Sequence, residues 1–275
     1  MAPVLYPPAR PQTIGEVLDG GFRIFRATLL RCLPYGLLAM LSSQASSVYT
    51  LIVHGPGRGA GRDDPVAWLM FAVGSFLGAV FYNAIILRQG AIATGVLRRA
   101  QPGLRSAVRR APATLCVIIV MTLMTGVWFA PLLAVARPRR LWAILVLGVP
   151  ASYVGVAVSC ALFALLIGGR GMYASLKYSV HLMRGNWWRA ATIYAVEIAM
   201  LGVFYTLAGV LAAVILPFAG HGDLAAITAV STVMAAVLVA VGVPFYSAMG
   251  LALYGDLEAR RDGADLARRL AAATP

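Results

Sequence analysis

The chain has 275 residues and a formal net charge of +13 at pH 7; 60% of its residues are hydrophobic and only 12% are charged. A soluble globular domain carries about twice that charged fraction, so the composition excludes a soluble domain and makes lipid the solvent for much of the surface. A nucleic-acid-binding protein would need a basic patch on a soluble fold, so we expect no nucleic acid partner.

Six apolar segments are long enough to cross the hydrocarbon layer of a bilayer, which takes roughly 20 helical residues. They lie at about 32–53, 66–87, 113–136, 141–167, 190–216 and 224–253. The sequence therefore predicts an all-α fold, a polytopic membrane bundle of about six transmembrane helices. We expect one membrane domain over 13–262, between a flexible N-terminal segment over 1–12 and a cytoplasmic tail over 263–275.

Basic residues are divided unequally between the two sides of the six predicted spans. Of the 23 Lys and Arg residues, 18 lie on the side that holds both termini. The other five are Arg58, Arg62, Arg137, Arg139 and Arg140. Because cytoplasmic loops carry an excess of Lys and Arg, we predict that both termini are cytoplasmic. The bias toward Arg is typical of a GC-rich bacterial genome, so we expect a multi-pass protein of the bacterial inner membrane.

A basic amphipathic stretch precedes the first, third and fifth spans. The first stretch opens with Thr13 and Glu16 at the spacing of a capping box, which predicts the start of a helix. We expect all three stretches to form interfacial helices at the cytoplasmic surface, with their basic side chains toward anionic lipid headgroups. The predicted headgroup contacts are Arg105, Arg109, Arg110, Lys177 and Arg184.

Three segments carry a resemblance to a known family. They are RPQTIGEVLDGGFRIFRATLLR (Arg10–Arg31), SLKYSVHLMRGNWWR (Ser175–Arg189) and LYGDLEARRDGADL (Leu253–Leu266). Together they resemble the bacterial membrane-domain family named after glycerophosphoryl diester phosphodiesterases, although Gly255 stands where that family often has a second Tyr. The resemblance implies a stand-alone six-helix membrane domain. It does not imply phosphodiesterase catalysis, because the chain has no attached catalytic domain and no suitable acidic or His cluster.

Glu197 is the only acidic residue inside a predicted span. An ionisable side chain within a membrane is costly and marks a functional site by default. We expect Glu197 either to bind a proton or a cation, or to be hydrogen-bonded within the bundle to Asn83, Gln44 or a tyrosine. Asn83 and Gln44 themselves are expected to form hydrogen bonds between helices.

Small residues recur at helical spacing in two spans. Gly74 and Gly78 form a GxxxG pair in the second span. The fourth span carries Gly148, Ser152, Gly155 and Ser159. Both patterns predict close helix packing inside the bundle, with homo-oligomerisation as the alternative.

The sequence contains no serine-nucleophile motif, P-loop or dinucleotide fingerprint, and we predict no catalytic residue, metal or cofactor. His54, His181 and His221 lack metal-ligand spacing. We favour a non-enzymatic membrane protein that acts through lipids, in particular anionic lipids, or through a protein partner, in membrane assembly or envelope homeostasis. The alternative is a small transporter or permease that uses Glu197, which would need a polar cavity at mid-membrane.

Overall fold

A computed structural model describes residues 5–8, 10–55, 64–95, 104–133, 140–219, 224–261, 263 and 270. Within these ranges every regular element is a helix, which confirms the predicted all-α class. Six helical stretches are long and apolar enough to cross a membrane, which confirms the polytopic bundle. They are Ile14–Ser43, Pro65–Ala93, Leu104–Pro131, Val146–Leu166, Trp187–Leu211 and Val237–Arg261.

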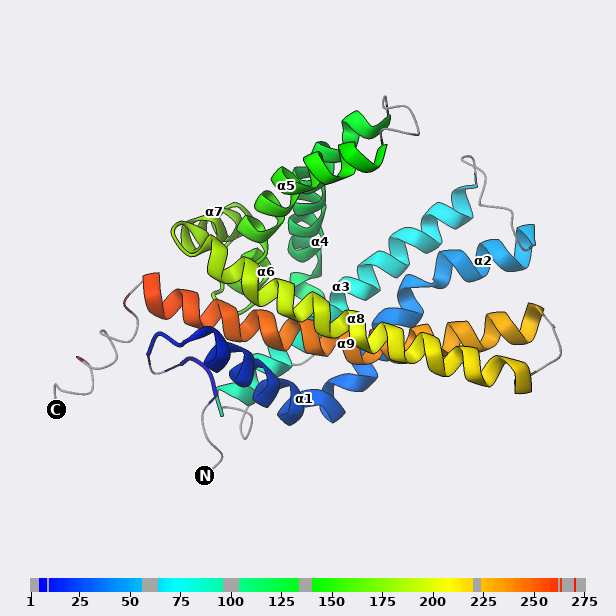
Figure 1. The fold of residues 1–275 in the computed structure, drawn as a ribbon, viewed down its shortest axis with the longest axis horizontal. Coiled ribbons are helices and arrows are strands. Elements are labelled where there is room, and N and C mark those ends of the chain that lie inside the picture. The colour runs from blue at the N-terminus through cyan, green and yellow to red at the C-terminus, as the bar shows by residue number, and fades with distance from the viewer. Residues whose placement is uncertain are drawn as a thin grey trace.

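The helices follow one another with short connections (Figure 1). In chain order they are α1 (Ile14–Ser43), α2 (Ala45–His54), α3 (Pro65–Ala93), α4 (Leu104–Gly126), the 3₁₀ helix η2 (Val127–Leu133), α5 (Arg140–Val158), α6 (Ala161–Leu166), α7 (Met172–Met183), α8 (Trp187–Ala219) and α9 (Leu224–Arg261). One end of the bundle holds the start of α1, the end of α3, all of α7 and the end of α9 (Figure 1). We call this end the α7 end.

The predicted amphipathic stretches behave differently from one another. The capping box is present: the Thr13 hydroxyl accepts from the Glu16 backbone, and the Glu16 carboxylate accepts from the Thr13 backbone at 2.7 Å. However, α1 then continues into the first span without a break, and α4 likewise runs through Pro112 into the third. The predicted separate interfacial helices are therefore not found for these two stretches, because each stretch forms the first part of its span. Only α7 is a separate helix.

Helix α1 lies between α9 and α3. Its contact with α9 is the most extensive between any two of the described helices. The backbones of the two helices approach closely at Gly36, where an added Cβ would lie 2.5 Å from the Ala240 carbonyl oxygen. Pro244 lies four residues after Ala240 and has no N–H, so this carbonyl lacks its usual helical donor. A glycine opposite it lets the two backbones meet.

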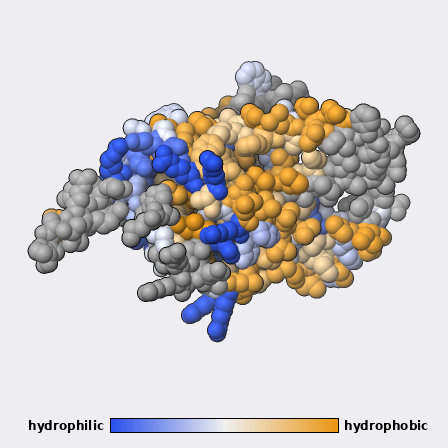
Figure 2. Space-filling view, turned by 90° about the horizontal axis from the view of Figure 1, so that it is seen from below, coloured by the Kyte–Doolittle hydropathy of each residue, from blue (hydrophilic) through white to orange (hydrophobic). Residues whose placement is uncertain are grey.

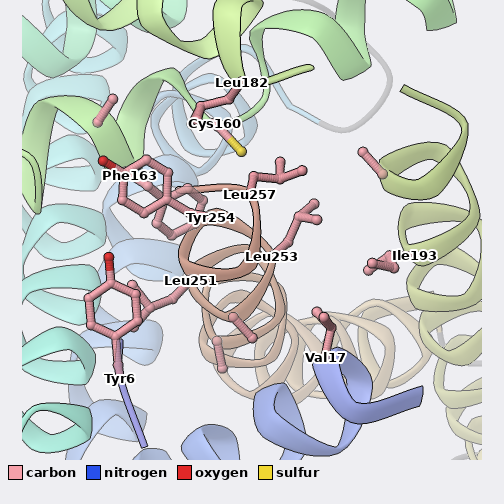
Figure 3. Close-up of a cluster of buried hydrophobic side chains, with 14 of the residues drawn as sticks. Tyr6, Val17, Cys160, Phe163, Leu182, Ile193, Leu251, Leu253, Tyr254 and Leu257 are labelled. Carbon is pink, nitrogen blue, oxygen red and sulfur yellow. The ribbon is translucent and has the colours of Figure 1, made fainter. Parts of the chain in front are cut away.

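The main buried cluster lies toward the α7 end, where side chains from α1, α6, α7, α8 and α9 converge (Figure 3). Tyr254 and Phe163 stack there with ring centroids 6.3 Å apart. Tyr6 also enters this cluster and is 5% exposed. The backbone N–H groups of Leu5 and Tyr6 donate to the Ala93 carbonyl at the end of α3. Part of the predicted flexible segment over 1–12 is therefore packed, because Tyr6 supplies an apolar ring to the core.

The outer surface divides by polarity (Figure 2). Hydrophilic residues gather toward one end, and apolar residues cover the middle of the visible face. Large apolar side chains on α3, α4, α5 and α8 are exposed; Trp142 and Val146, for example, are 73% and 69% exposed. A continuous apolar surface of this kind suits lipid contact.

The fourth predicted span is interrupted at Ser159 and Cys160, between α5 and α6. Ser179 of α7 stabilises the break, because its hydroxyl donates to the Ala157 carbonyl at 2.9 Å and accepts from the Cys160 N–H at 3.1 Å. Backbone groups freed at membrane depth need such partners. The break thereby joins α7 to the fourth span.

The close contact at Gly36 gives a paired prediction. Gly36→Ala should lower the free energy of unfolding by about 1–3 kcal/mol, the usual cost of overpacking, because the three atoms nearest the new methyl group are all backbone atoms of Ala240. Gly78→Ala should be neutral or stabilising by up to about 1 kcal/mol from helix propensity, since a Cβ at Gly78 would meet nothing within 4 Å. Thermal unfolding in detergent measures both, and equal effects would contradict the packing.

Candidate functional site

The three segments that carry the family resemblance meet at the α7 end, around the carboxylate of Asp256. Asp256 is fully buried and lies in the last turns of α9. Its Oδ1 accepts from the Gln12 backbone N–H at 2.7 Å. Its Oδ2 accepts from Arg189 Nε at 2.9 Å and from Arg260 Nε at 3.0 Å. Both guanidinium groups also donate to the Gln12 carbonyl.

This Asp256 cluster was not predicted as a site, although each segment was singled out. The spacing of Asp256 and Arg260 by four residues was the local signal. Burying a carboxylate is costly unless it is paired and hydrogen-bonded, and here three donors surround it. The cluster therefore fixes the entry to α1, the start of α8 and the end of α9 relative to one another.

A second carboxylate in the same region binds tyrosines. Tyr6 and Tyr254 each donate to Glu258, both at 3.3 Å. Burial, followed by the adjacent Glu258 carboxylate, raises the pKa of Tyr6 well above its usual range. The phenol therefore stays protonated and keeps its role as donor.

A groove of about 440 Å³ runs beside α7, and we call it the α7 groove. One wall belongs to α7 and its C-cap, with Tyr173, Leu176, Lys177, Val180, His181 and Arg184. The other wall is apolar and consists of Val120 and Met124 on α4 and Val158 on α5. Lys177, His181 and Arg184 are spaced by four and three residues, so they share one face of α7, and all three are exposed.

The α7 groove thus contains Lys177 and Arg184, two of the five predicted headgroup contacts. Arg105 and Arg109 are exposed and line a separate hollow at the start of α4. Arg110 differs from them, because its Nη1 donates to the Leu166 carbonyl at 2.5 Å. It caps the C-terminal end of α6 and is engaged with protein, so it is not positioned as a free headgroup contact.

The intramembrane polar residues fall into different settings. Asn83 of α3 joins α4 by donating to the Ala107 carbonyl at 3.2 Å and accepting from Thr114 at 2.9 Å. Gln44 is the C-cap residue of α1 and lies at its outer end. Neither is hydrogen-bonded to Glu197, because the two Glu197 carboxylate oxygens have no hydrogen-bond partner among the described residues.

Gln89 is a buried polar residue that lies beyond the predicted second span over 66–87. Helix α3 extends to Ala93, so Gln89 lies in the core, where its amide donates to the Pro244 carbonyl at 2.7 Å. Ser247 donates to the Gln89 side-chain oxygen at 2.8 Å. Hydropathy ended the predicted span at Leu87 because the next two residues, Arg88 and Gln89, are polar.

The small-residue patterns are packed only in part. An added Cβ at Gly74 would collide with the Ser42 carbonyl of α1, and one at Gly155 would contact Thr125 at 3.5 Å. At Gly78 and Gly148 a Cβ would meet nothing within 4 Å. Ser152 is exposed, and Ser159 bonds its own helix at Val156. The prediction of close helix packing is therefore wrong for Gly78 and Gly148, because neither glycine lies against another helix.

Comparisons with protein-family models, curated proteins and solved structures find no match to this chain. The fold therefore defines the class alone: a multi-pass helical membrane protein with a basic, hydrogen-bonded end. Within the described ranges, no group of three or more His, Cys, Asp or Glu side chains is arranged to hold a metal ion.

The Asp256 cluster yields a matched pair of variants. Asp256→Asn should destabilise the protein by about 3–5 kcal/mol, the usual effect of breaking a buried ion pair from one side, because two guanidinium groups lose their anion. Asp19→Asn removes another carboxylate paired with an Arg four residues on, but that pair is exposed, so the effect should stay within about 1 kcal/mol. Chemical or thermal unfolding in micelles separates the two, and equal losses would refute the proposed importance of the Asp256 cluster.

Proposed function

We propose that this chain is a non-enzymatic membrane protein that binds an anionic phospholipid in the α7 groove. The observation that carries the proposal is the composition of that groove's two walls. Lys177, His181 and Arg184 present cationic or hydrogen-bonding groups along one face of α7, while Val120, Met124 and Val158 form an apolar wall opposite. A phospholipid has this same division between a phosphate and acyl chains.

The energetics favour an anionic headgroup over a zwitterionic one. Lys and Arg near the membrane surface each attract anionic lipid by about 1 kcal/mol, and charge-assisted hydrogen bonds to phosphate are among the strongest in proteins. The exposed Arg105 and Arg109 extend the basic surface along the same end of the bundle. Together they support a role exerted through lipid contact, in membrane assembly or envelope homeostasis.

The transporter alternative has less support. It requires a polar cavity lined by Glu197, but Glu197 lines neither the α7 groove nor the apolar groove of about 170 Å³ between α8 and α9. Glu197 is instead enclosed, with 1% of its surface exposed. We therefore assign the lipid role to the α7 groove and treat Glu197 separately.

Lipid binding can be tested with the double variant Lys177→Gln/Arg184→Gln. Loss of two near-surface charges should weaken phosphatidylglycerol binding by roughly 10- to 30-fold, at about 1 kcal/mol per charge. Native mass spectrometry of the purified protein measures the adducts, with phosphatidylcholine as the zwitterionic comparison.

The matched control is Arg26→Gln/Arg31→Gln, which removes the same charge from exposed positions on α1. It should leave phosphatidylglycerol binding within a few-fold of the unmodified protein. Equal weakening by both double variants would show that net charge acts without a specific groove, and unchanged adducts in the first variant would reject the proposal.

We also propose that the α7 end faces the cytoplasm of a bacterial cell, which places the groove in the inner leaflet of its cytoplasmic membrane. Support comes from the excess of basic residues on that side in the sequence. Of the five opposing arginines, Arg58, Arg62, Arg137 and Arg139 lie outside the described residues. A single-cysteine series can test the orientation in intact cells: Arg184→Cys should resist a membrane-impermeant thiol reagent, whereas Val66→Cys should react. The reverse pattern would invert the orientation.

A further inference from the structure

Glu197 is a buried acid that the lipid proposal does not use. It lies on α8 within the span Trp187–Leu211, is 1% exposed, and has no hydrogen-bond partner for either oxygen among the residues described. Other buried polar side chains are partnered: Asn83 and Gln89 each have a donor and an acceptor, and Asp256 has three donors. Besides Glu197, only Arg88 Nε, Arg170 Nε and the Tyr194 hydroxyl lack a partner among the buried side-chain atoms described. Glu197 is therefore an exception that needs a physical explanation.

Phenols on three helices lie near Glu197. The phenols of Tyr82 on α3, Tyr194 on α8 and Tyr246 on α9 lie within electrostatic range of the carboxyl. The Cys160 thiol, at the break between α5 and α6, interacts with Tyr194 and Tyr246. None of the ion pairs found among the described residues involves Glu197.

An unpaired carboxylate in an apolar interior is far too costly to remain charged, so such a group takes up a proton or a cation. A bound metal cation would need several oxygen ligands, and the surrounding α8 backbone is an intact helix whose carbonyls are already used. The surrounding phenols can donate hydrogen bonds to a carboxylate, but they offer it no positive charge. A proton is therefore the ligand that suits this cluster.

We propose that Glu197 is an exchangeable proton-binding site at the centre of the bundle, independent of lipid binding. At neutral pH the carboxyl holds the proton. On release, the O–H bond of the carboxyl breaks, the proton passes to water, and the remaining carboxylate accepts hydrogen bonds from the tyrosine hydroxyls. We assign the exchange route to Tyr246, because it is 36% exposed, whereas Tyr194 is 8% exposed.

Infrared difference spectroscopy of the protein in lipid nanodiscs tests the site directly. The unmodified protein should show a protonated-carboxyl band at neutral pH that is lost at alkaline pH and is missing in Glu197→Gln. Glu258→Gln is the control, because it removes a carboxyl that lies near tyrosines at the α7 end, and it should leave the band in place.

Tyr246→Phe keeps the carboxyl and therefore tests the route even if Glu197→Gln folds poorly. The band should persist in this variant, but its exchange in heavy water should slow several-fold. A neutral-pH spectrum without a Glu197-dependent protonated band would overturn the proposal. A band that never exchanges would overturn the exchangeable site. A band that exchanges equally fast in the unmodified protein and in Tyr246→Phe would overturn the route past Tyr246.

Discussion

The buried carboxylate of Asp256 is the interaction on which the α7 end depends. It holds a backbone N–H that precedes α1, a guanidinium at the start of α8 and another at the end of α9. Since each of these helices is long and mostly apolar along its length, hydrophobic contact alone would allow them to slide or rotate against lipid. The directional hydrogen bonds of Asp256 set their register. Tyr6 packs against α9, one of the helices that this register fixes.

The same logic of satisfied polar groups runs through the interior. Ser179 covers the backbone break between α5 and α6, Asn83 links α3 to α4, and Gln89 links α3 to α9. In a membrane no water can substitute for these partners, so these side chains satisfy polar groups that would otherwise be buried without a hydrogen bond. Glu197 is the one buried acid that stands outside this scheme among the residues described, and this contrast gives the proton proposal its physical basis.

The sequence was sufficient to predict the class of fold and several local features. Six apolar runs of spanning length predicted the bundle, and Thr13 with Glu16 predicted the start of α1. Periodicity could not say whether an amphipathic face meets lipid or another helix, so α1 and α4 were expected to begin with separate surface helices. Charge alone likewise could not separate Arg110, which caps α6, from Arg109, which is exposed. The role of Asp256 depends on residues 67 and 244 positions away in the chain, and no local pattern carries that information.

The pairing of α1 with α9 has a consequence for biosynthesis. Chains enter the membrane from the N-terminus onward, so α1 is inserted long before its principal partner exists. During that interval Gly36 and the neighbouring face of α1 have α3 as a neighbour but lack the α9 backbone that later covers them. The last span to emerge therefore completes the assembly, and it also delivers Asp256 to Gln12 and Arg189. Until then the side of α1 around Gly36 lacks the helix that covers it in the complete bundle.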